Sequence, residues 1–210
     1  MAGTITKLEI QKKNKERVNV YVDDSFALAV SLNVALGLKK GQFLGDAEIE
    51  QLRRQDERHK AYDRALFYLG FRARSRAEME RYLRGKEFLP ETIEATLTRL
   101  AAEGYLDDAA FAQSWTGSRQ RTRPKSRRAL RHELRQKGVD REAIEAALAD
   151  MDEAEAAAAA LGAKLRQWQH LDEETYTKKA MGFLSRRGFS YSVARAAVEA
   201  GRRQIDDGLL

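Results

Sequence analysis

The residues that could take part in chemistry are few and scattered along the chain. Three histidines, His59, His132 and His170, lie far apart, and none has a second His at metal-ligand spacing. The stretch GLKKGQ at 37–42 contains glycine and lysine but lacks the Gly-Lys-Ser/Thr ending of a phosphate-binding loop. No nucleophile elbow, dinucleotide fingerprint or cysteine occurs. The sequence therefore predicts a protein that is not an enzyme, with no cofactor and no metal site.

Three pairs of adjacent aspartates are the remaining candidates for acid–base chemistry. They are Asp23-Asp24, Asp107-Asp108 and Asp206-Asp207. Each pair sits where a turn or the start of a helix is expected, and there an aspartate accepts hydrogen bonds from free backbone N–H groups. Capping explains these pairs, so no catalytic role is assigned to them.

The densest chemical signal is a run of basic residues. From Gly117 to Lys137 the chain has nine Lys or Arg residues and one acid, Glu133. So many charges of one sign repel one another, and this favours an anionic partner, as does the net charge of +6. The candidate binding residues are Arg119, Arg121, Arg123, Lys125, Arg127, Arg128, Arg131 and Arg135, with a matching cluster of Arg72, Arg74 and Arg76. The alternative is a solvated face balanced by nearby acids such as Asp150, Asp152 and Glu153.

The composition limits the kind of protein that could present these residues. The chain has 210 residues, of which 43% are hydrophobic and 33% charged. The charged fraction is high for a globular protein and suits small helical units, which have much surface for their volume. No apolar run approaches the ~20 residues of a membrane span, and the N-terminus lacks the core of a signal peptide. We therefore expect a cytoplasmic protein.

Residues 1–45 predict a small antiparallel β meander. The segments TKLEIQ and RVNVYVDD alternate apolar and polar residues, as half-buried strands do, and FALAV follows as a third strand. Gly37, Gly41 and Gly45 then interrupt the chain around a short helical piece. From Asp46, a candidate N-cap, the pattern becomes helical and remains so to about residue 204. Residues 46–60 are expected to form a linking helix.

The helical part contains one pattern three times, at offsets of 51 and then 50 residues. The segments EMERYLRGKEFLPETIEATL, RALRHELRQKGVDREAIEAAL and KAMGFLSRRGFSYSVARAAV align without gaps in five apolar columns. The columns are Met79, Leu130 and Ala180; Leu83, Leu134 and Leu184; Phe88, Val139 and Phe189; Ile93, Ile144 and Ala194; and Leu97, Leu148 and Val198. A further apolar helix precedes each pair, so we expect three-helix repeats at 61–108, 109–152 and 153–204, followed by a tail at 205–210.

Turn and capping residues support this alignment. Gly138 and Gly188 suit a left-handed position between the two helices, whereas the first repeat has Glu87 there. The following helices are expected to begin with Asp140 and Ser190 as N-caps and with Pro90 at the first helical position. Ser75 and Glu78 have capping-box spacing.

The basic run can now be placed on this pattern. On a helix at 126–137, Leu130 and Leu134 face the core, whereas Arg128, Arg131 and Arg135 share the opposite side. The other two repeats keep the core columns but not this stripe of arginines. Packing therefore explains the columns and does not explain the arginine stripe.

With its repeats laid out, the sequence resembles the RecX family of bacterial regulatory proteins. The resemblance extends over nearly the whole chain and includes ALFYLGFRARSRAEMERYL, GYLDDAAFAQSW and LRQKGVDREAIEAAL. It implies a mainly α fold, with three tandem three-helix repeats in an elongated body and a small N-terminal antiparallel β meander. It also implies a non-catalytic regulator of DNA repair and the SOS response, which binds the RecA–DNA filament and mostly inhibits the ATPase and strand exchange of the recombinase.

Charge alone leaves two functions open. In the first, the basic face contacts a RecA filament and its single- or double-stranded DNA. In the second, the protein binds DNA or RNA without sequence preference and without a recombinase partner. A plain helical scaffold would leave the arginine stripe unexplained. We expect no membrane partner, and the polar outer faces suggest a monomer.

Overall fold

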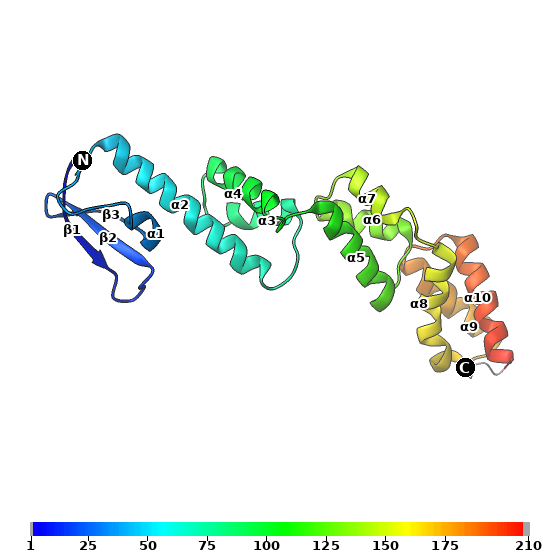
Figure 1. Ribbon diagram of the computed structural model, residues 1–210. Helices are drawn as coiled ribbons and strands as arrows, with labels where there is room; N and C mark the ends of the chain where they lie inside the picture. The colour runs from blue at the N-terminus through cyan, green and yellow to red at the C-terminus, as the bar shows by residue number, and fades with distance from the viewer. Residues whose placement is uncertain (1, 208–210) are drawn as a thin grey trace. The chain divides into compact units, whose positions relative to one another are not determined.

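The computed structural model describes residues 2–207. Its elements, in chain order, are β1 (Gly3–Ile10), β2 (Arg17–Val22), β3 (Ser25–Ser31), α1 (Leu32–Ala35), β4 (Phe43–Leu44), α2 (Asp46–Leu69), α3 (Arg76–Arg84), α4 (Pro90–Ala102), α5 (Asp108–Thr122), α6 (Arg127–Gln136), α7 (Arg141–Leu148), α8 (Glu153–Trp168), α9 (Glu173–Arg186) and α10 (Tyr191–Asp206) (Figure 1). The mainly α fold with an N-terminal antiparallel sheet is confirmed. None of the helices within residues 2–207 is long and apolar enough to cross a membrane.

The elements form two compact units. One unit is Met1–Arg74 with Met79–Leu106, and the other is Ser75–Glu78 with Asp107–Leu210. The last helix extends to Asp206, beyond the expected end of the third repeat, and residues 208–210 of the expected tail lie outside the described residues.

The N-terminal sheet has one strand more than the sequence predicts. Its order is β3-β2-β1-β4, with every neighbouring pair antiparallel. The short β4 joins the edge of β1, where Leu44 pairs with Gly3, and two residues are too few to show an alternating pattern. The β2–β3 hairpin turns at Asp23 and Asp24, whose φ angles of 46° and 60° are typical of a two-residue hairpin. Ile10, an apolar residue at the end of β1, is 51% exposed.

The helix α2 is continuous through residue 60, so the expected boundary between a linking helix and the first repeat falls inside one element. Gly45, rather than Asp46, is its N-cap, and Glu48 accepts a hydrogen bond from the Gly45 backbone N–H at 2.7 Å. The N-terminal half of α2 packs on the sheet through Ile49 and Leu52. Its C-terminal half packs on α4 in the core of the first repeat. Figure 1 shows α2 extending from the sheet to α4.

A buried carboxylate ties the sheet to α2. Asp56 is 3% exposed and accepts hydrogen bonds from both terminal nitrogens of Arg17, at 3.1 and 3.0 Å, and from the Ser31 backbone N–H at 2.8 Å. Lys60, one turn later, forms an ion pair with it at 2.7 Å. Burial by itself would raise the pKa of Asp56, but the hydrogen bonds from Arg17 and Lys60 outweigh burial and lower the pKa. The buried Asp56 carboxylate, with hydrogen bonds to Arg17 and Ser31, therefore holds the sheet on the helix.

The apolar columns of the repeat alignment form the cores of the three-helix repeats, which confirms the alignment register. Every column residue is buried except Phe88, which is partly buried against the first repeat core. In the second unit the columns of the second and third repeats join one continuous hydrophobic cluster.

The turns and caps also agree with the sequence. Gly138 and Gly188 have φ angles of 79° and 89°, and Glu87 takes the same left-handed conformation at 63°. Asp140 and Ser190 cap α7 and α10, and Pro90 opens α4.

Two junctions in the second unit use equivalent residues. Ser75 donates its hydroxyl to the carbonyl oxygen of Lys137 at 2.6 Å. Ser126, which lies 51 positions after Ser75, donates its backbone N–H to the carbonyl oxygen of Arg187 at 3.1 Å. Lys137 and Arg187 each precede the glycine of an interhelical turn. Ser75 and Ser126, at equivalent positions, thus each donate a hydrogen bond to the residue before the glycine of an interhelical turn in the second unit.

Candidate functional site

The predicted basic face contains its own counter-charges. Glu133, the one acid in the basic run, accepts hydrogen bonds at Oε2 from Trp115 Nε1 at 2.8 Å and from Arg119 Nε at 3.0 Å. Lys125 forms an ion pair with the other carboxylate oxygen. Burial would raise the pKa of Glu133, but the hydrogen bonds from Lys125, Trp115 and Arg119 outweigh burial and lower the pKa. Arg119 and Lys125 are therefore partly neutralised within the protein.

Two further arginines of the predicted face are held by α7, α8 and the segment between them. Arg131 donates to both carboxylate oxygens of Glu145, at 2.6 and 2.7 Å, and this hydrogen bonding lowers the pKa of Glu145. Arg127 donates its guanidinium to the carbonyl oxygen of Met151. Its backbone N–H binds the carboxylate of Glu153 at 2.7 Å.

Four arginines of the predicted face remain available for a partner. They are Arg121, Arg123, Arg128 and Arg135. All four are exposed, and none forms an ion pair within the part of the chain that the structure describes. Fewer positive charges are thus free to bind a partner than the number of basic residues in the run suggests.

The three arginines of the matching cluster, Arg72, Arg74 and Arg76, make different contacts. Arg74 stacks on Tyr68, with its guanidinium carbon 3.8 Å from the ring centre, and Arg72 donates to the neighbouring carbonyl oxygen of Ala73. Arg76 belongs to the second unit, where its backbone N–H donates to Asp108 at 2.8 Å.

The arginine stripe of α6 lines a shallow depression on the second repeat. The depression has a volume of about 590 Å³ and is lined by Arg128, Arg131, His132, Arg135, Arg141 and Glu145. Four arginines therefore face one carboxylate, and planar guanidinium groups suit carboxylate and phosphate oxygens. The depression is able to bind an anionic group.

Sequence reasoning missed Arg141 because it followed one helix only. Arg141 is the first residue of α7, and the turn through Gly138 brings it beside the stripe on α6. An arginine directly after the N-cap Asp140 was the available signal. His132, seen in the sequence only as an isolated histidine, lines the same depression and contacts Gln136 at 2.9 Å.

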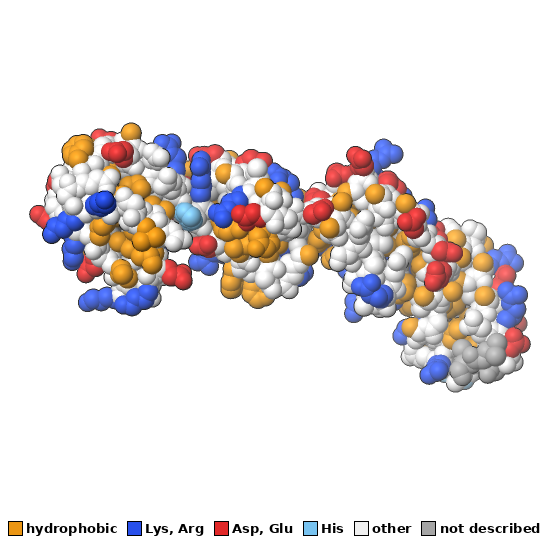
Figure 2. Space-filling view, in the orientation of Figure 1, with side chains coloured by type: hydrophobic (Ala, Val, Ile, Leu, Met, Phe, Trp, Pro, Cys, Tyr) orange, Lys and Arg blue, Asp and Glu red, His pale blue; other side chains and the backbone are white. Residues whose placement is uncertain are grey.

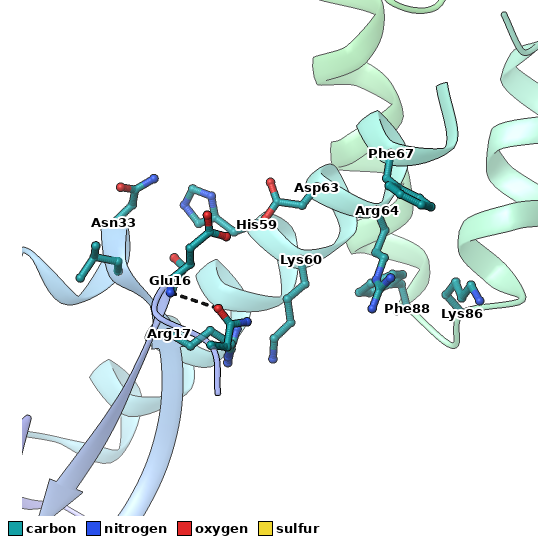
Figure 3. Close-up of a pocket in the computed structure, with 13 residues that line it drawn as sticks. Glu16, Arg17, Asn33, His59, Lys60, Asp63, Arg64, Phe67, Lys86 and Phe88 are labelled. Carbon is teal, nitrogen blue, oxygen red and sulfur yellow. Dashed lines mark hydrogen bonds between the residues drawn. The ribbon is translucent and has the colours of Figure 1, made fainter. Parts of the chain in front are cut away.

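The first unit has a larger cleft of about 890 Å³ with mixed charge. Figure 3 shows Lys60, Arg64 and Phe67 projecting from α2, and Lys86 and Phe88 on the segment between α3 and α4. Glu16 and Asp63 also line the cleft, while the buried Asp56 already pairs with Arg17 and Lys60. Because basic and acidic side chains line this cleft together, its charge does not favour an anionic partner.

One face of the molecule shows the same mixture of positive and negative side chains. On the face shown in Figure 2, Lys and Arg side chains are interspersed with Asp and Glu over both units. Within residues 2–207, no three His, Asp or Glu side chains are grouped so that they could hold a metal ion.

The chain matches four domain models of one family. They are the regulatory protein RecX N-terminal domain at residues 3–44 and the first, second and third RecX three-helix domains at residues 61–100, 107–148 and 152–198.

Relatives and solved structures agree with these matches. Regulatory protein RecX of Bacillus subtilis is 36% identical over 208 residues, which cover 97% of this chain and 79% of that protein. The same-named protein of Listeria monocytogenes is 31% identical over 207 residues, covering 96% and 77%. A crystal structure of regulatory protein RecX superposes with a TM-score of 0.71 at 30% identity, over 95% of this chain and 100% of that one. From its repeats, its sheet and these relatives, the chain belongs to the RecX family of regulatory proteins.

Proposed function

We propose that the protein is a non-catalytic regulator that binds the RecA–DNA filament and mostly inhibits the ATPase and strand exchange of the recombinase. Family membership supports the regulatory role, because the relatives are named regulatory proteins. The supporting observation in the molecule is the depression on the second repeat. Arg128, Arg135 and Arg141 line it together with a single acid, Glu145, which already pairs with Arg131.

The proposed contact is electrostatic. A RecA–DNA filament offers phosphate groups and acidic side chains, and either class of oxygen can accept bidentate hydrogen bonds from arginine. The exposed arginines provide such donors without first breaking an internal ion pair. Arg119 and Lys125 are less suited to the contact, because Glu133 already binds them.

A second candidate function is sequence-nonspecific binding of DNA or RNA without a recombinase. Arg121 and Arg123 favour it, because they are exposed in and just after the last turn of α5 and need only a phosphate backbone as partner. The two functions differ in whether affinity for single-stranded DNA rises strongly when RecA coats the strand.

The test measures DNA-dependent ATPase and strand exchange by RecA while this protein is titrated in. Both activities are expected to fall at substoichiometric or near-equal amounts of protein. The double variant Arg128→Glu/Arg135→Glu should inhibit only at much higher concentration, because two favourable contacts become repulsions. Arg166→Glu/Arg203→Glu is the matched control, since both residues are exposed and lack ion pairs within residues 2–207.

The control should inhibit at nearly wild-type concentrations. No inhibition by the wild-type protein at any concentration would contradict the recombinase role and favour the nucleic-acid alternative. Equal inhibition by the two double variants would mean that the depression on the second repeat is not the contact.

A further inference from the structure

The third repeat has a hollow of its own, formed by the end of α8 and one side of α9. It has a volume of about 640 Å³ and is lined by Trp168, Glu174, Thr175, Lys178, Lys179, Gly182 and Arg186. The α9 residues are mostly three or four positions apart, so they lie on one side of the helix. The hollow therefore combines an aromatic ring with a basic helix face.

Gly182 makes the hollow possible. It lies in the middle of this face, at the position that His132 occupies in the second repeat. A Cβ atom added at Gly182 would meet only the Arg186 guanidinium, at 3.4 Å, which is ordinary contact with a flexible side chain. The space above Gly182 is thus open to a ligand.

The indole ring of Trp168 is held in a defined orientation. It packs edge-to-face against Phe183, with ring centres 5.6 Å apart and planes at 89°. Phe183 in turn packs on the core of the second unit and lies under the guanidinium of Arg187 at 4.5 Å. Trp168 is only partly buried and lines the hollow. A ring fixed in this way offers a stacking surface at little entropic cost.

The basic side chains of the hollow are available. Lys178, Lys179 and Arg186 are exposed, and none forms an ion pair within residues 2–207. Glu174 is the one acid among the lining residues. The hollow therefore suits a ligand that has both negative charge and a flat ring. In a duplex the bases are stacked on one another, whereas single-stranded nucleic acid can offer an unstacked base beside each phosphate.

We propose that this hollow binds a segment of single-stranded nucleic acid, with one base stacked on Trp168 and the adjoining phosphates held by Lys178, Lys179 and Arg186. The site needs no recombinase, so the proposal rests on the second candidate function and adds a defined site and ligand class to it. Its test contains no recombinase, so failure here and failure of RecA inhibition are separate results.

The test uses the fluorescence of Trp168. The chain has two tryptophans, and Trp115 is partly buried with its indole N–H bound to Glu133 at 2.8 Å. In a Trp115→Phe protein, Trp168 is the one remaining indole. Titration with an oligothymidylate at low salt should quench its emission to saturation, because a stacked base contacts the ring. A duplex or a polyphosphate at equal phosphate concentration should leave the emission nearly unchanged. Equal quenching by the duplex, or none by the oligothymidylate, would overturn the proposal.

Three variants test separately the open space above Gly182, the stacking on Trp168 and the charge of the two lysines. Gly182→Leu fills the hollow without changing charge, and leucine has the higher helix propensity, so the melting temperature should not fall. Its affinity for a labelled oligothymidylate, measured by fluorescence anisotropy, should fall at least about 10-fold. Trp168→Leu should weaken binding roughly 5- to 150-fold. Lys178→Ala/Lys179→Ala should flatten the log–log salt dependence by about 1.4, since each single-strand phosphate contact contributes about 0.7.

The matched control is Arg166→Ala/Arg203→Ala, which removes two exposed charges from the same repeat outside the hollow. It should retain the wild-type salt dependence. A folded Gly182→Leu protein that binds the oligothymidylate as tightly as wild type would show that the hollow is not the binding site.

Discussion

The guanidinium of Arg131 donates to both carboxylate oxygens of Glu145, at 2.6 and 2.7 Å. This pair joins α6 to α7 at the edge of the basic depression on the second repeat. Arg128 lies on the same side of α6 but is exposed and has no ion pair within residues 2–207. The arginines of one helical stripe therefore have different roles, and reversing all of their charges at once would mix a binding effect with a stability effect.

Charge reversal should separate these roles. Arg131→Glu places two carboxylates together and should lower the free energy of unfolding by about 1 kcal/mol, the size expected for a partly exposed pair. Arg128→Glu should change it by less than about 0.5 kcal/mol, because residue 128 lies in the first turn of α6, where a negative charge suits the helix dipole. Urea denaturation midpoints measure both. Adding Glu145→Arg to the Arg131→Glu protein should restore its stability, because the ion pair is re-formed with the charges exchanged. Equal denaturation midpoints for Arg131→Glu and Arg128→Glu would contradict the different roles assigned to the two arginines.

The left-handed turn of the first repeat should be improved by glycine. Glu87 has a φ of 63°, a conformation that costs a non-glycine residue roughly 1–2 kcal/mol. Glu87→Gly should therefore stabilise the first unit by about 0.5–1 kcal/mol, after the greater freedom of glycine in the unfolded chain is included.

Gly138→Ala tests the same geometry in the opposite direction. Gly138 has a φ of 79°, and a Cβ atom there would lie 2.3 Å from the Cβ of Ala77. The change should cost about 2–4 kcal/mol through conformation and overlap. Denaturation of both variants against wild type is the measurement. Destabilisation by Glu87→Gly would show that the Glu87 side chain has a stabilising role that outweighs its backbone strain.

The Glu133 cluster should make stability depend on pH. The pKa of Glu133 in the folded protein is lowered from its ordinary value of 4.5. Its contribution to stability is therefore complete above about pH 4.5 and is lost as pH falls through the lower folded value. At pH 7, Glu133→Gln should reduce stability by about 1–3 kcal/mol, because Arg119 and Lys125 lose a charged partner. The difference in free energy of unfolding between Glu133→Gln and wild type should become smaller below about pH 4.5. A difference that stays constant from pH 7 to about pH 3 would contradict the lowered pKa.

The contact between sheet and helix should depend on Asp56. Asp56→Ala leaves the Arg17 guanidinium and the Ser31 N–H without their acceptor. The loss should be about 3–5 kcal/mol, as for other broken buried ion pairs, and amide exchange in β2 and β3 should accelerate. Asp63→Ala on the exposed side of α2 is the control, with a change expected within about 0.5 kcal/mol. Equal effects of the two substitutions would mean that Asp56 does not hold the sheet on α2.

The sequence by itself determined the helical repeats, their register and most of their caps. These features depend on neighbours within a few residues. Leu130 and Leu134 are buried because they are four apart on one helix, and Asp140 caps α7 because its side chain reaches an N–H three residues later. Gly138 takes the left-handed turn because it has no Cβ. Features that depend on local periodicity and local hydrogen bonding can therefore be predicted from the order of residues.

Only the tertiary structure decided which charges are neutralised and which surfaces are hollow. Asp56 binds Arg17, 39 positions away, and Glu133 binds Arg119 and Lys125 across a turn. Arginine and lysine side chains are long and flexible, so their partners depend on how helices pack rather than on spacing along the chain. The hollow beside Trp168 likewise requires the end of α8 to lie beside one face of α9. In the basic run from Gly117 to Lys137, a count of basic residues therefore overstated the charge that is free to bind a partner, because Glu133 and Glu145 pair with Arg119, Lys125 and Arg131.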